Sequence, residues 1–556
     1  MYCKSRGQTR RLPEVAAWAL IAAAAAFAQG QTQRSASADR AKSRASAAAG
    51  KSRVATGKFS RRVNAALLEA HAEKAFWGIL VAEAGTGKLV YELNPDHFFT
   101  PASNAKLFTT ALAMATLGPD YRFRTTIESR GTLSADGRLQ GDLIFVGRGD
   151  PNLSNRKFPL GAKVEHEGPA EKILAEMADL VVARGVKAID GDVIGDDSYF
   201  PYDPYPAGWS AGDLYFSFGA PISAIAVNDN TISIEVTPGA RLGDPASLTI
   251  APWPGYETFG HEITTSASDS KPKFAVVREP GTKPILFRGS IPLGAPPIRL
   301  DLAMDDPAEY SAHALKLLLE ARGVQIAGQA RAQHGLSPDR GEVLASVAAP
   351  TLAPVATGEA PVDSGATPLV LAEHFSPPLV DMIRVVNKVS QNLHAELLLR
   401  AVAKEKAGTG TTDAGIQVEQ DFLKSVGIAD GDAVLVDGSG LSRENLVTPR
   451  AVLTLLQYVA RQPWGEQFAS TLPVAGEDGT LENRLRNTSA AGRIYAKTGS
   501  LEHVRAMSGY ASTRRGAHLV FTLFGNNDPE KAADATAVLD ATCEAMVEEI
   551  GPLRKK

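Results

Sequence analysis

Ser103 and Lys106 open an apolar stretch at residues 101–119, PASNAKLFTTALAMATLGP. Their spacing of three residues places both side chains on one face of a helix. Because the other positions of this helix are almost all apolar, we expect it to be buried. Burial removes the solvation that favours an ammonium ion, so the pKa of Lys106 should fall and its neutral amine could take a proton from the neighbouring hydroxyl. The pattern therefore predicts that Ser103 is a nucleophile.

The Ser-x-x-Lys spacing occurs three more times in the chain, so it is a weak pattern by itself. The other serines are Ser154, Ser268 and Ser270. They lie among charged residues and prolines, and none of them begins an apolar helix. We interpret all three as loop residues.

Two further short patterns follow in the second half of the chain. They are Ser390-Gln391-Asn392, inside a helical stretch, and Lys497-Thr498-Gly499, on a strand-like run. Ser-x-x-Lys, Ser-x-Asn and Lys-Thr-Gly in this order are the motif set of penicillin-binding proteins and class A β-lactamases. Each motif alone is weak, whereas the ordered set is specific.

With these motifs the chain resembles the low-molecular-mass class C penicillin-binding proteins, a family of D-alanyl-D-alanine carboxypeptidases and endopeptidases. The resemblance extends from residue 59 to residue 551. Five longer segments carry it as well: GDLIFVGRGDPNLS (141–154), GDVIGDDSYF (191–200), APISAIAVNDN (220–230), DGSGLSRENLVTP (437–449) and LPVAGEDGTL (472–481). The second motif has Gln391 where aspartate is common, but its chemistry requires only the flanking serine and asparagine.

The resemblance implies a role for each residue of the first two motifs. Ser103 would attack a carbonyl carbon of the substrate. Lys106 and Ser390 would pass the serine proton towards the leaving amine, and Asn392 would hold the substrate amide.

The third motif would bind the substrate's terminal carboxylate through Lys497 and Thr498, which precede Gly499. Backbone N–H groups of Ser103 and Ser500 would form the oxyanion hole. The charge of Lys497 would also help to keep the lysine of the first motif neutral.

The spacing of the motifs favours this family over its relatives. From Ser103 to Ser390 there are 287 positions, too many for the helical segment that joins the same motifs in a class A β-lactamase. The resemblance implies an α+β multi-domain protein: a penicillin-binding/β-lactamase-like transpeptidase fold whose large inserted domain carries a nested third domain. The predicted boundaries are 59–122 and 370–556 for the catalytic domain, 123–200 and 300–347 for the second, 201–299 for the third, and 348–369 for an Ala/Pro-rich loop.

Local patterns predict the elements that must hold these motifs. In the catalytic segments we expect helices at 59–73, 449–461 and 534–550, a helical block at 378–423, and strands at 76–83, 88–92, 505–512 and 518–524. Between 121 and 344 the texture changes to short strands with two helices, 171–184 and 310–322.

Members of this family that act on diaminopimelate-containing peptides hold the free end of that side chain in a pocket. The matching positions here are Asp197, Tyr202, Leu441, Arg443 and Leu501. Asp197 would pair with the ammonium group and Arg443 with the carboxylate. The alternative is that Asp197 caps a turn and Arg443 makes a structural ion pair.

Other enzyme classes have weaker support. Ser210 lies in a Gly-x-Ser-x-Gly pattern, but a nucleophile elbow needs a strand before it and a helix after it, and neither is predicted. A β-lactamase needs a deacylating base, for which Glu482 has an incomplete context. A catalytically silent scaffold is disfavoured by the intact motifs. The ten histidines show no metal-ligand spacing.

The N-terminal residues predict export. Four basic residues precede an apolar stretch at 15–28 that ends in a small-x-small cleavage pattern, so we expect a signal peptide at 1–28 and a periplasmic mature chain. A membrane anchor is the alternative, but the stretch is shorter than the ~20 residues that span a bilayer. Residues 29–58 are basic and rich in Ser and Ala, which predicts a disordered linker with weak attraction to an anionic envelope surface.

The predicted function is that of a serine-type D-alanyl-D-alanine carboxypeptidase/endopeptidase. It would act through a Ser103 acyl-enzyme on peptidoglycan stem peptides that end in D-Ala-D-Ala and on their cross-links, and the sequence leaves open which activity dominates. β-Lactams should acylate the same serine and be released slowly. The resemblance implies no cofactor and no metal, and a net charge of -4 argues against nucleic-acid binding.

Overall fold

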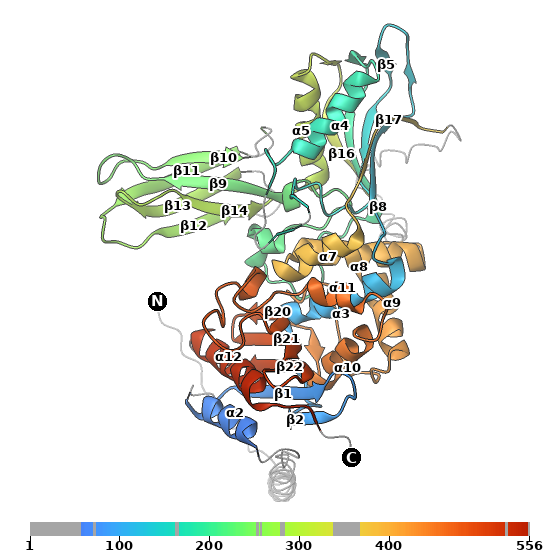
Figure 1. Ribbon diagram of the computed structural model, residues 1–556. Coiled ribbons are helices and arrows are strands. Elements are labelled where there is room, and N and C mark those ends of the chain that lie inside the picture. The colour runs from blue at the N-terminus through green and yellow to red at the C-terminus, as the bar shows by residue number, and fades with distance from the viewer. Residues whose placement is uncertain are drawn as a thin grey trace, which may run out of the picture. The chain divides into compact units, whose positions relative to one another are not determined.

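The computed structural model describes residues 57–69, 74–158, 160–161, 166–251, 255, 258–278, 284–336, 367–528 and 532–553 (Figure 1). The predicted signal peptide, nearly all of the predicted linker and most of the Ala/Pro-rich loop lie outside these residues. Within the described ranges, no helix combines the length and the hydropathy that crossing a bilayer requires.

One antiparallel five-stranded sheet joins the two ends of the chain, in the order β2-β1-β22-β21-β20. Its strands are β1 (Phe76–Glu83), β2 (Leu89–Leu93), β20 (Ile494–Leu501), β21 (Val504–Ser512) and β22 (His518–Asn526). Both faces are covered by hydrophobic clusters, and neighbouring residues of a strand belong to different clusters because their side chains point to opposite faces. In β1, for example, Leu80 and Ala82 belong to one hydrophobic cluster and Ile79 and Val81 to another.

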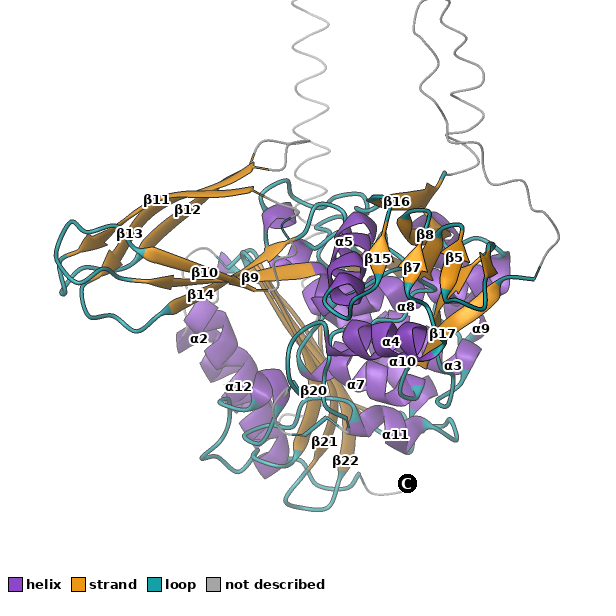
Figure 2. Cartoon of the chain, turned by 90° about the horizontal axis from the view of Figure 1, so that it is seen from above, coloured by secondary structure: helices purple, strands orange, loops and turns teal. Residues whose placement is uncertain are grey.

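Two helices, α2 (Lys58–Glu69) and α12 (Ala532–Glu549), cover the face of this sheet to which Ile79 points. The other face packs against a larger helical group, as Figure 2 shows. That group comprises α3 (Lys106–Leu117), α7 (Leu379–Lys388), α8 (Asn392–Ala407), α9 (Thr412–Ser425), α10 (Pro449–Val459) and α11 (Gly465–Ser470). The short strands β18 (Ala433–Val434) and β19 (Leu446–Val447) lie between α9 and α10, and the 3-10 turn η6 (Gly479–Leu481) follows α11.

The stretch at 101–119 forms two elements where the pattern predicted one helix. A 3-10 turn, η2 (Ala102–Ala105), contains Ser103 and runs directly into α3, which begins at Lys106. Residues 106–114 are all buried, which confirms the expected burial. A lysine at the start of such a helix has no access to solvent.

The chain between α3 and α7 contains two further sheets that pack on α4 (Lys172–Ala183) and α5 (Pro307–Glu320). Their orders are β16-β8-β6-β3-β17 and β15-β7-β5-β4. The strands are β3 (Arg124–Ser129), β4 (Thr132–Leu133), β5 (Arg138–Gln140), β6 (Leu143–Val146), β7 (Ala188–Ile189), β8 (Val193–Pro201), β15 (Gln325–Ile326), β16 (Ala330–Gly335) and β17 (Leu369–Phe375). β17 pairs with β3, so this sheet takes a strand from the segment that the sequence-based boundary at residue 370 assigned to the catalytic domain.

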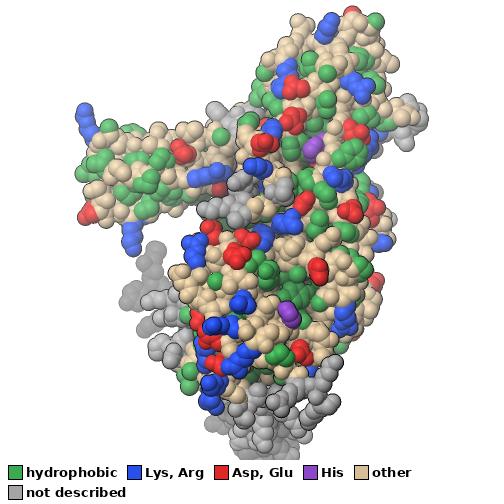
Figure 3. Space-filling model, viewed as in Figure 1, with side chains coloured by type: hydrophobic (Ala, Val, Ile, Leu, Met, Phe, Trp, Pro, Cys, Tyr) green, Lys and Arg blue, Asp and Glu red, His purple; other side chains and the backbone are tan. Residues whose placement is uncertain are grey.

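Two three-stranded sheets, β10-β9-β14 and β11-β13-β12, form the nested part. Their strands are β9 (Thr231–Thr237), β10 (Ser247–Ala251), β11 (Thr258–Ser266), β12 (Lys273–Arg278), β13 (Pro284–Pro292) and β14 (Ile298–Ala303). Three short 3-10 turns precede β9: η3 (Asp213–Tyr215), η4 (Ser217–Gly219) and η5 (Asn228–Asn230). On the face shown in Figure 3, charged side chains of both signs lie over the nested part.

Most predicted elements occur within a few residues of their predicted bounds. The strand at 76–83 matches β1 residue for residue. The block at 378–423 is three helices, because the backbone turns at Ser390 and again at Gly408, which ends α8 in a left-handed conformation. Helix α5 starts at Pro307 because the Asp306 side chain caps it, accepting two backbone N–H groups. Helix α11 was not predicted.

Candidate active site

The three motifs meet at one place, at the start of α3, between α7 and α8, and on the edge strand β20. The Lys106 amine lies 2.9 Å from the Ser103 hydroxyl, 2.6 Å from the Asn392 side-chain oxygen and 2.6 Å from the Ser439 carbonyl oxygen. The serine is half-buried, whereas the lysine is fully buried. A reactant could therefore reach the hydroxyl from solvent while the amine stays dry.

Burial lowers the pKa of Lys106 to about 7, although the nearby Asp437 and Glu396 carboxylates oppose this shift. A neutral amine has two N–H donors and one lone pair. The Asn392 and Ser439 oxygens can only accept hydrogen bonds, so they take both donors. The lone pair then points at the Ser103 hydroxyl, which is the arrangement that a general base requires.

The orientation of the Asn392 amide depends on a contact with the inserted part of the chain, the segment between α3 and α7. Its nitrogen donates to the Phe218 carbonyl oxygen in η4, at 2.7 Å. Because a carbonyl can only accept, this bond fixes which end of the amide faces Lys106. The second amide hydrogen remains for a ligand.

A second buried amine belongs to Lys497 on β20. It lies 2.9 Å from the Ser390 hydroxyl and 2.8 Å from the Thr498 carbonyl oxygen. Burial, together with the positive charge of Lys106, lowers the pKa of Lys497 well below its ordinary value. A charge on Lys106 therefore disfavours a second charge on Lys497.

The backbone is held in sparsely populated conformations at two points of the site. Ala102, just before the serine nucleophile predicted from the first motif, has φ of 48° and Ser390 has φ of 62°. Such left-handed conformations of non-glycine residues cost of order 1–3 kcal/mol each and persist only where the surroundings enforce them. The packing and hydrogen bonds around Ala102 and Ser390 therefore hold the backbone of the site in these conformations.

Close packing against two glycines holds the turn η2. A Cβ on Gly499 would lie 2.7 Å from the Pro101 carbonyl oxygen, and one on Gly440 would lie 1.9 Å from that of Ala102. The buried Asn104 side chain also donates to the Lys497 carbonyl oxygen at 3.2 Å. Strand β20 and the 437–445 segment therefore clamp the turn from two sides.

The edge of β20 that faces away from β21 matters for the predicted oxyanion hole, because the Ser500 N–H lies along it. The Ala496 N–H donates to Pro473, and the Thr498 carbonyl accepts from the Lys497 amine, so both groups point away from the neighbouring strand β21. Backbone groups along a strand alternate in direction. The N–H of exposed Ser500 therefore points to the same open edge.

Buried carboxylates that sequence reasoning missed support the site from behind. Glu396 accepts the N–H groups of Gly438 and Ser439, at 3.1 and 2.8 Å. Asp437 accepts those of Gly440 and Ser442, at 2.8 and 2.7 Å. These bonds aim the Ser439 carbonyl at Lys106. The Asp-Gly-Ser-Gly-Leu-Ser segment was recognised in the sequence, but nothing in its pattern indicates a backbone role.

The predicted side-chain pocket is only partly assembled. Arg443 is exposed and approaches Glu502, which follows Leu501, at 3.3 Å from its carbonyl and 3.6 Å from its carboxylate. Leu441 is buried.

Asp197 and Tyr202 are engaged in a different cluster. The Asp197 carboxylate is 3% exposed, accepts from the Ser223 hydroxyl at 2.8 Å and lies 2.9 Å from the His334 ring. Burial would lower the pKa of His334, but its bonds to Asp197 and Asp306 raise it to about 10, so the ring is protonated and neutralises the carboxylate. Tyr202 packs against this ring. In this structure Asp197 and Tyr202 therefore belong to the His334 cluster, and their assignment to the pocket stays a prediction.

The competing serines lack comparable surroundings. Ser210 lies in an exposed loop between Gly208, whose φ is 74°, and η3, without the preceding strand of an elbow. Ser154 donates to Asp229, and Ser270 bonds within the turn between β11 and β12. Glu482 pairs with Arg486 at 3.7 Å.

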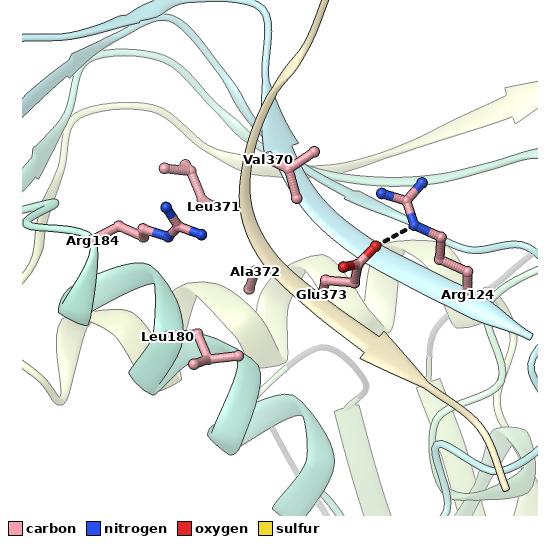
Figure 4. A pocket seen from close by; sticks show the side chains of 7 residues that line it. All are labelled: Arg124, Leu180, Arg184, Val370, Leu371, Ala372 and Glu373. Carbon is pink, nitrogen blue, oxygen red and sulfur yellow. Dashed lines mark hydrogen bonds and ion pairs between the residues drawn. The ribbon is translucent and has the colours of Figure 1, made fainter.

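One surface pocket lies apart from the motif residues. Residues of β3, of β17, and of α4 and its C-cap line it: Arg124, Leu180, Arg184, Val370, Leu371, Ala372 and Glu373 (Figure 4). Arg124 and Glu373 point toward one another and form an ion pair. Over the described ranges, no three His, Cys, Asp or Glu side chains gather closely enough to hold a metal ion.

Comparisons with known proteins agree on one family. The model of the D-Ala-D-Ala carboxypeptidase 3 (S13) family matches residues 59–357 and 353–546. A D-alanyl-D-alanine carboxypeptidase of an Actinomadura species is 33% identical over 500 residues, covering 88% of this chain and 84% of that protein. The carboxypeptidase DacB of Haemophilus influenzae is 27% identical over 454 residues, covering 81% and 85%.

Solved structures show the same fold. Penicillin binding protein 4 (dacB) of Haemophilus influenzae has a TM-score of 0.70 at 25% identity, over 86% of this chain and 97% of that one. The structure of the same protein complexed with a β-lactam has a TM-score of 0.68 at 24% identity, over 87% and 99%. The predicted fold class is therefore confirmed.

Substituting Gly440 tests the clamp on η2. Gly440→Ala should lower the free energy of unfolding by about 1–3 kcal/mol more than Gly431→Ala. Both glycines have positive φ, 78° and 85°, but a Cβ at Gly431 meets nothing within 4 Å. Urea unfolding of the two variants measures this difference, and equal losses would contradict the close approach to Ala102.

Proposed function

The chain belongs to the D-Ala-D-Ala carboxypeptidase 3 (S13) family of serine peptidases, and we propose that it works through an acyl-enzyme on Ser103. The proposal rests above all on the Lys106 amine, which is buried, has a pKa of about 7 and lies 2.9 Å from the Ser103 hydroxyl. That pairing supplies an activated serine at neutral pH without a histidine.

Acylation follows from this geometry. The Ser103 oxygen attacks the carbonyl carbon of the penultimate D-Ala while its proton moves to the neutral Lys106 amine. The developing oxyanion is stabilised by the N–H groups of Ser103 and Ser500. When the C–N bond breaks, the proton that Lys106 accepted passes through Ser390 to the leaving amine, so D-Ala departs and Lys106 is neutral again.

Deacylation reverses the proton movements. A water molecule attacks the ester carbon and gives its proton to Lys106, and the Ser103 oxygen leaves with a proton as the carboxylic acid forms. Each cycle thus returns the lysine to its neutral form.

The remaining motif residues orient the substrate in this proposal. The second amide hydrogen of Asn392 binds the substrate amide. Lys497, Thr498 and the close-packed Gly499 present an amine and a hydroxyl to the terminal carboxylate, and both groups can donate hydrogen bonds to it. Thr498 is half-buried, and its hydroxyl bonds that of Thr480 at 2.7 Å, which fixes its direction.

The same site would accept cross-linked peptides, because endopeptidase and carboxypeptidase cleavage differ only in the group on the leaving side of the scissile bond. β-Lactams would acylate Ser103, since their ring amide mimics that bond, and the Haemophilus influenzae relative has been solved with a β-lactam. We also propose that the protein is exported to the periplasm, where peptidoglycan lies. Weak envelope association through residues 29–58 belongs to this proposal.

Labelling with a fluorescent penicillin tests the acyl-enzyme. Wild-type protein and Ser210→Ala should take the label in equal amounts, and Ser103→Ala should take none, because the half-buried Ser103 hydroxyl lies beside the Lys106 base whereas Ser210 lies in an exposed loop. Mass spectrometry of the labelled peptide identifies the site. Label that persists in Ser103→Ala would contradict the assignment.

We propose that Leu441, Arg443 and Leu501 contact the third residue of the stem peptide. The exposed Arg443 guanidinium would pair with the side-chain carboxylate of diaminopimelate, which lysine lacks.

Paired peptides that end in D-Ala-D-Ala test this pocket. Wild-type protein should prefer diaminopimelate to lysine at the third position, and Arg443→Ala should reduce that preference about tenfold, as loss of a charge-assisted hydrogen bond predicts. Arg450→Ala removes another exposed arginine, one that pairs with Asp96, and should leave the ratio unchanged. Equal turnover of both peptides by the wild type would refute the pocket.

A further inference from the structure

Three consecutive residues of the inserted part adopt an unfavourable backbone conformation. Asn228, Asp229 and Asn230, which form η5, have φ values of 51°, 55° and 54°. Asparagine and aspartate tolerate this left-handed region better than other non-glycine residues, but three in succession need support from their surroundings. This turn places the Asp229 carboxylate against the catalytic part, by which we mean the sheet β2-β1-β22-β21-β20 and the helices that pack on it.

The Asp229 carboxylate is held by a dense set of donors. One oxygen accepts from the Ser154 hydroxyl at 2.5 Å, from Arg156 at 2.7 Å and from the His394 ring at 3.0 Å. The other accepts from a second nitrogen of Arg156 and from the Gln391 amide at 3.0 Å. Burial would raise the pKa of Asp229, but Arg156 and His394 hold it well below its ordinary value. The carboxylate is therefore a fixed negative charge.

Gln391 connects this charge to the second motif. Its amide nitrogen donates to Asp229, and its amide oxygen accepts the Leu393 N–H at 3.0 Å, which caps the first turn of α8. On its two sides lie Ser390, with the strained φ of 62°, and Asn392, the first residue of the helix. Both ends of the glutamine amide are used, so the peptide between α7 and α8 has one favoured position.

We propose that Asp229 is a positioning residue for catalysis: through Gln391 it holds Ser390 and Asn392 at hydrogen-bond distance from the two buried lysine amines. Those distances are 2.9 Å from Ser390 to Lys497 and 2.6 Å from Asn392 to Lys106. This inference rests on the proposed function, because it assigns Asp229 to the acylation step. It gives the inserted part a direct role in the chemistry of the catalytic part.

Isosteric substitutions test the contact. Gln391→Glu keeps the acceptor for the Leu393 N–H but faces Asp229 with a second carboxylate, so acylation by a chromogenic cephalosporin should slow about 10- to 100-fold. Asp229→Asn should slow it less, because an asparagine oxygen can still accept from Gln391. The double variant Gln391→Glu/Asp229→Asn should acylate at least about fivefold faster than Gln391→Glu alone, because the amide introduced at position 229 can donate to the new carboxylate.

Asp305→Asn is the matched control. It breaks an ion pair with the buried Arg278 in the same inserted part, at 2.5 Å, without touching a motif residue. It should lower the urea midpoint and leave acylation unchanged. A merely structural Asp229 would instead change stability and acylation together and show no rescue in the double variant.

The outcomes separate the role of Asp229 from the proposed function. If Gln391→Glu is acylated at the wild-type rate, or if the double variant is acylated as slowly as Gln391→Glu, the role of Asp229 is overturned while the proposed function stays intact. A wild-type protein that is never acylated would overturn the proposed function, and this inference with it.

Discussion

A lysine amine without access to water is the feature on which the rest of the structure depends. The Lys106 amine is fully buried, so it makes its hydrogen bonds with three protein neighbours, Ser103, Asn392 and Ser439. Two of these neighbours can only accept, which leaves the lone pair for the serine hydroxyl. The fold brings them from distant parts of the chain, and each is fixed by a bond of its own: the asparagine by the Phe218 carbonyl, and the Ser439 carbonyl by carboxylates behind it.

The inserted part contributes hydrogen bonds to this arrangement. It reaches the second motif at two points, through the Phe218 carbonyl at Asn392 and through the Asp229 carboxylate at Gln391. The strained conformation of Ser390 has a physical counterpart in these contacts, because strain persists only where packing and hydrogen bonds outweigh it. A catalytic domain separated from its insertion would lose both supports.

The meeting of the three motifs could be predicted from the sequence, because the chemistry expected of them depends on side-chain type and order. Helix and strand periodicity located most elements of the catalytic part, and the apolar run at 101–119 correctly indicated burial of Lys106. The Ser439 and Phe218 carbonyls could not be predicted, since a backbone group leaves no trace in residue type. The partners of Asp197 could not be predicted, because resemblance supplies an acidic residue in a matching segment but not the His334 ring that the fold places beside its carboxylate.

The protonation state of Lys106 is the central claim, and nuclear magnetic resonance of protein labelled with [13Cε]lysine measures it directly. Comparison with Lys106→Met assigns the resonance. Burial lowers the folded-state pKa from the ordinary 10.5 to about 7, so the signal should move between about pH 6 and 8 as the amine loses its proton, and the base form should dominate above about pH 7. A Lys106 resonance that stays at the ammonium position up to about pH 9 would contradict the account.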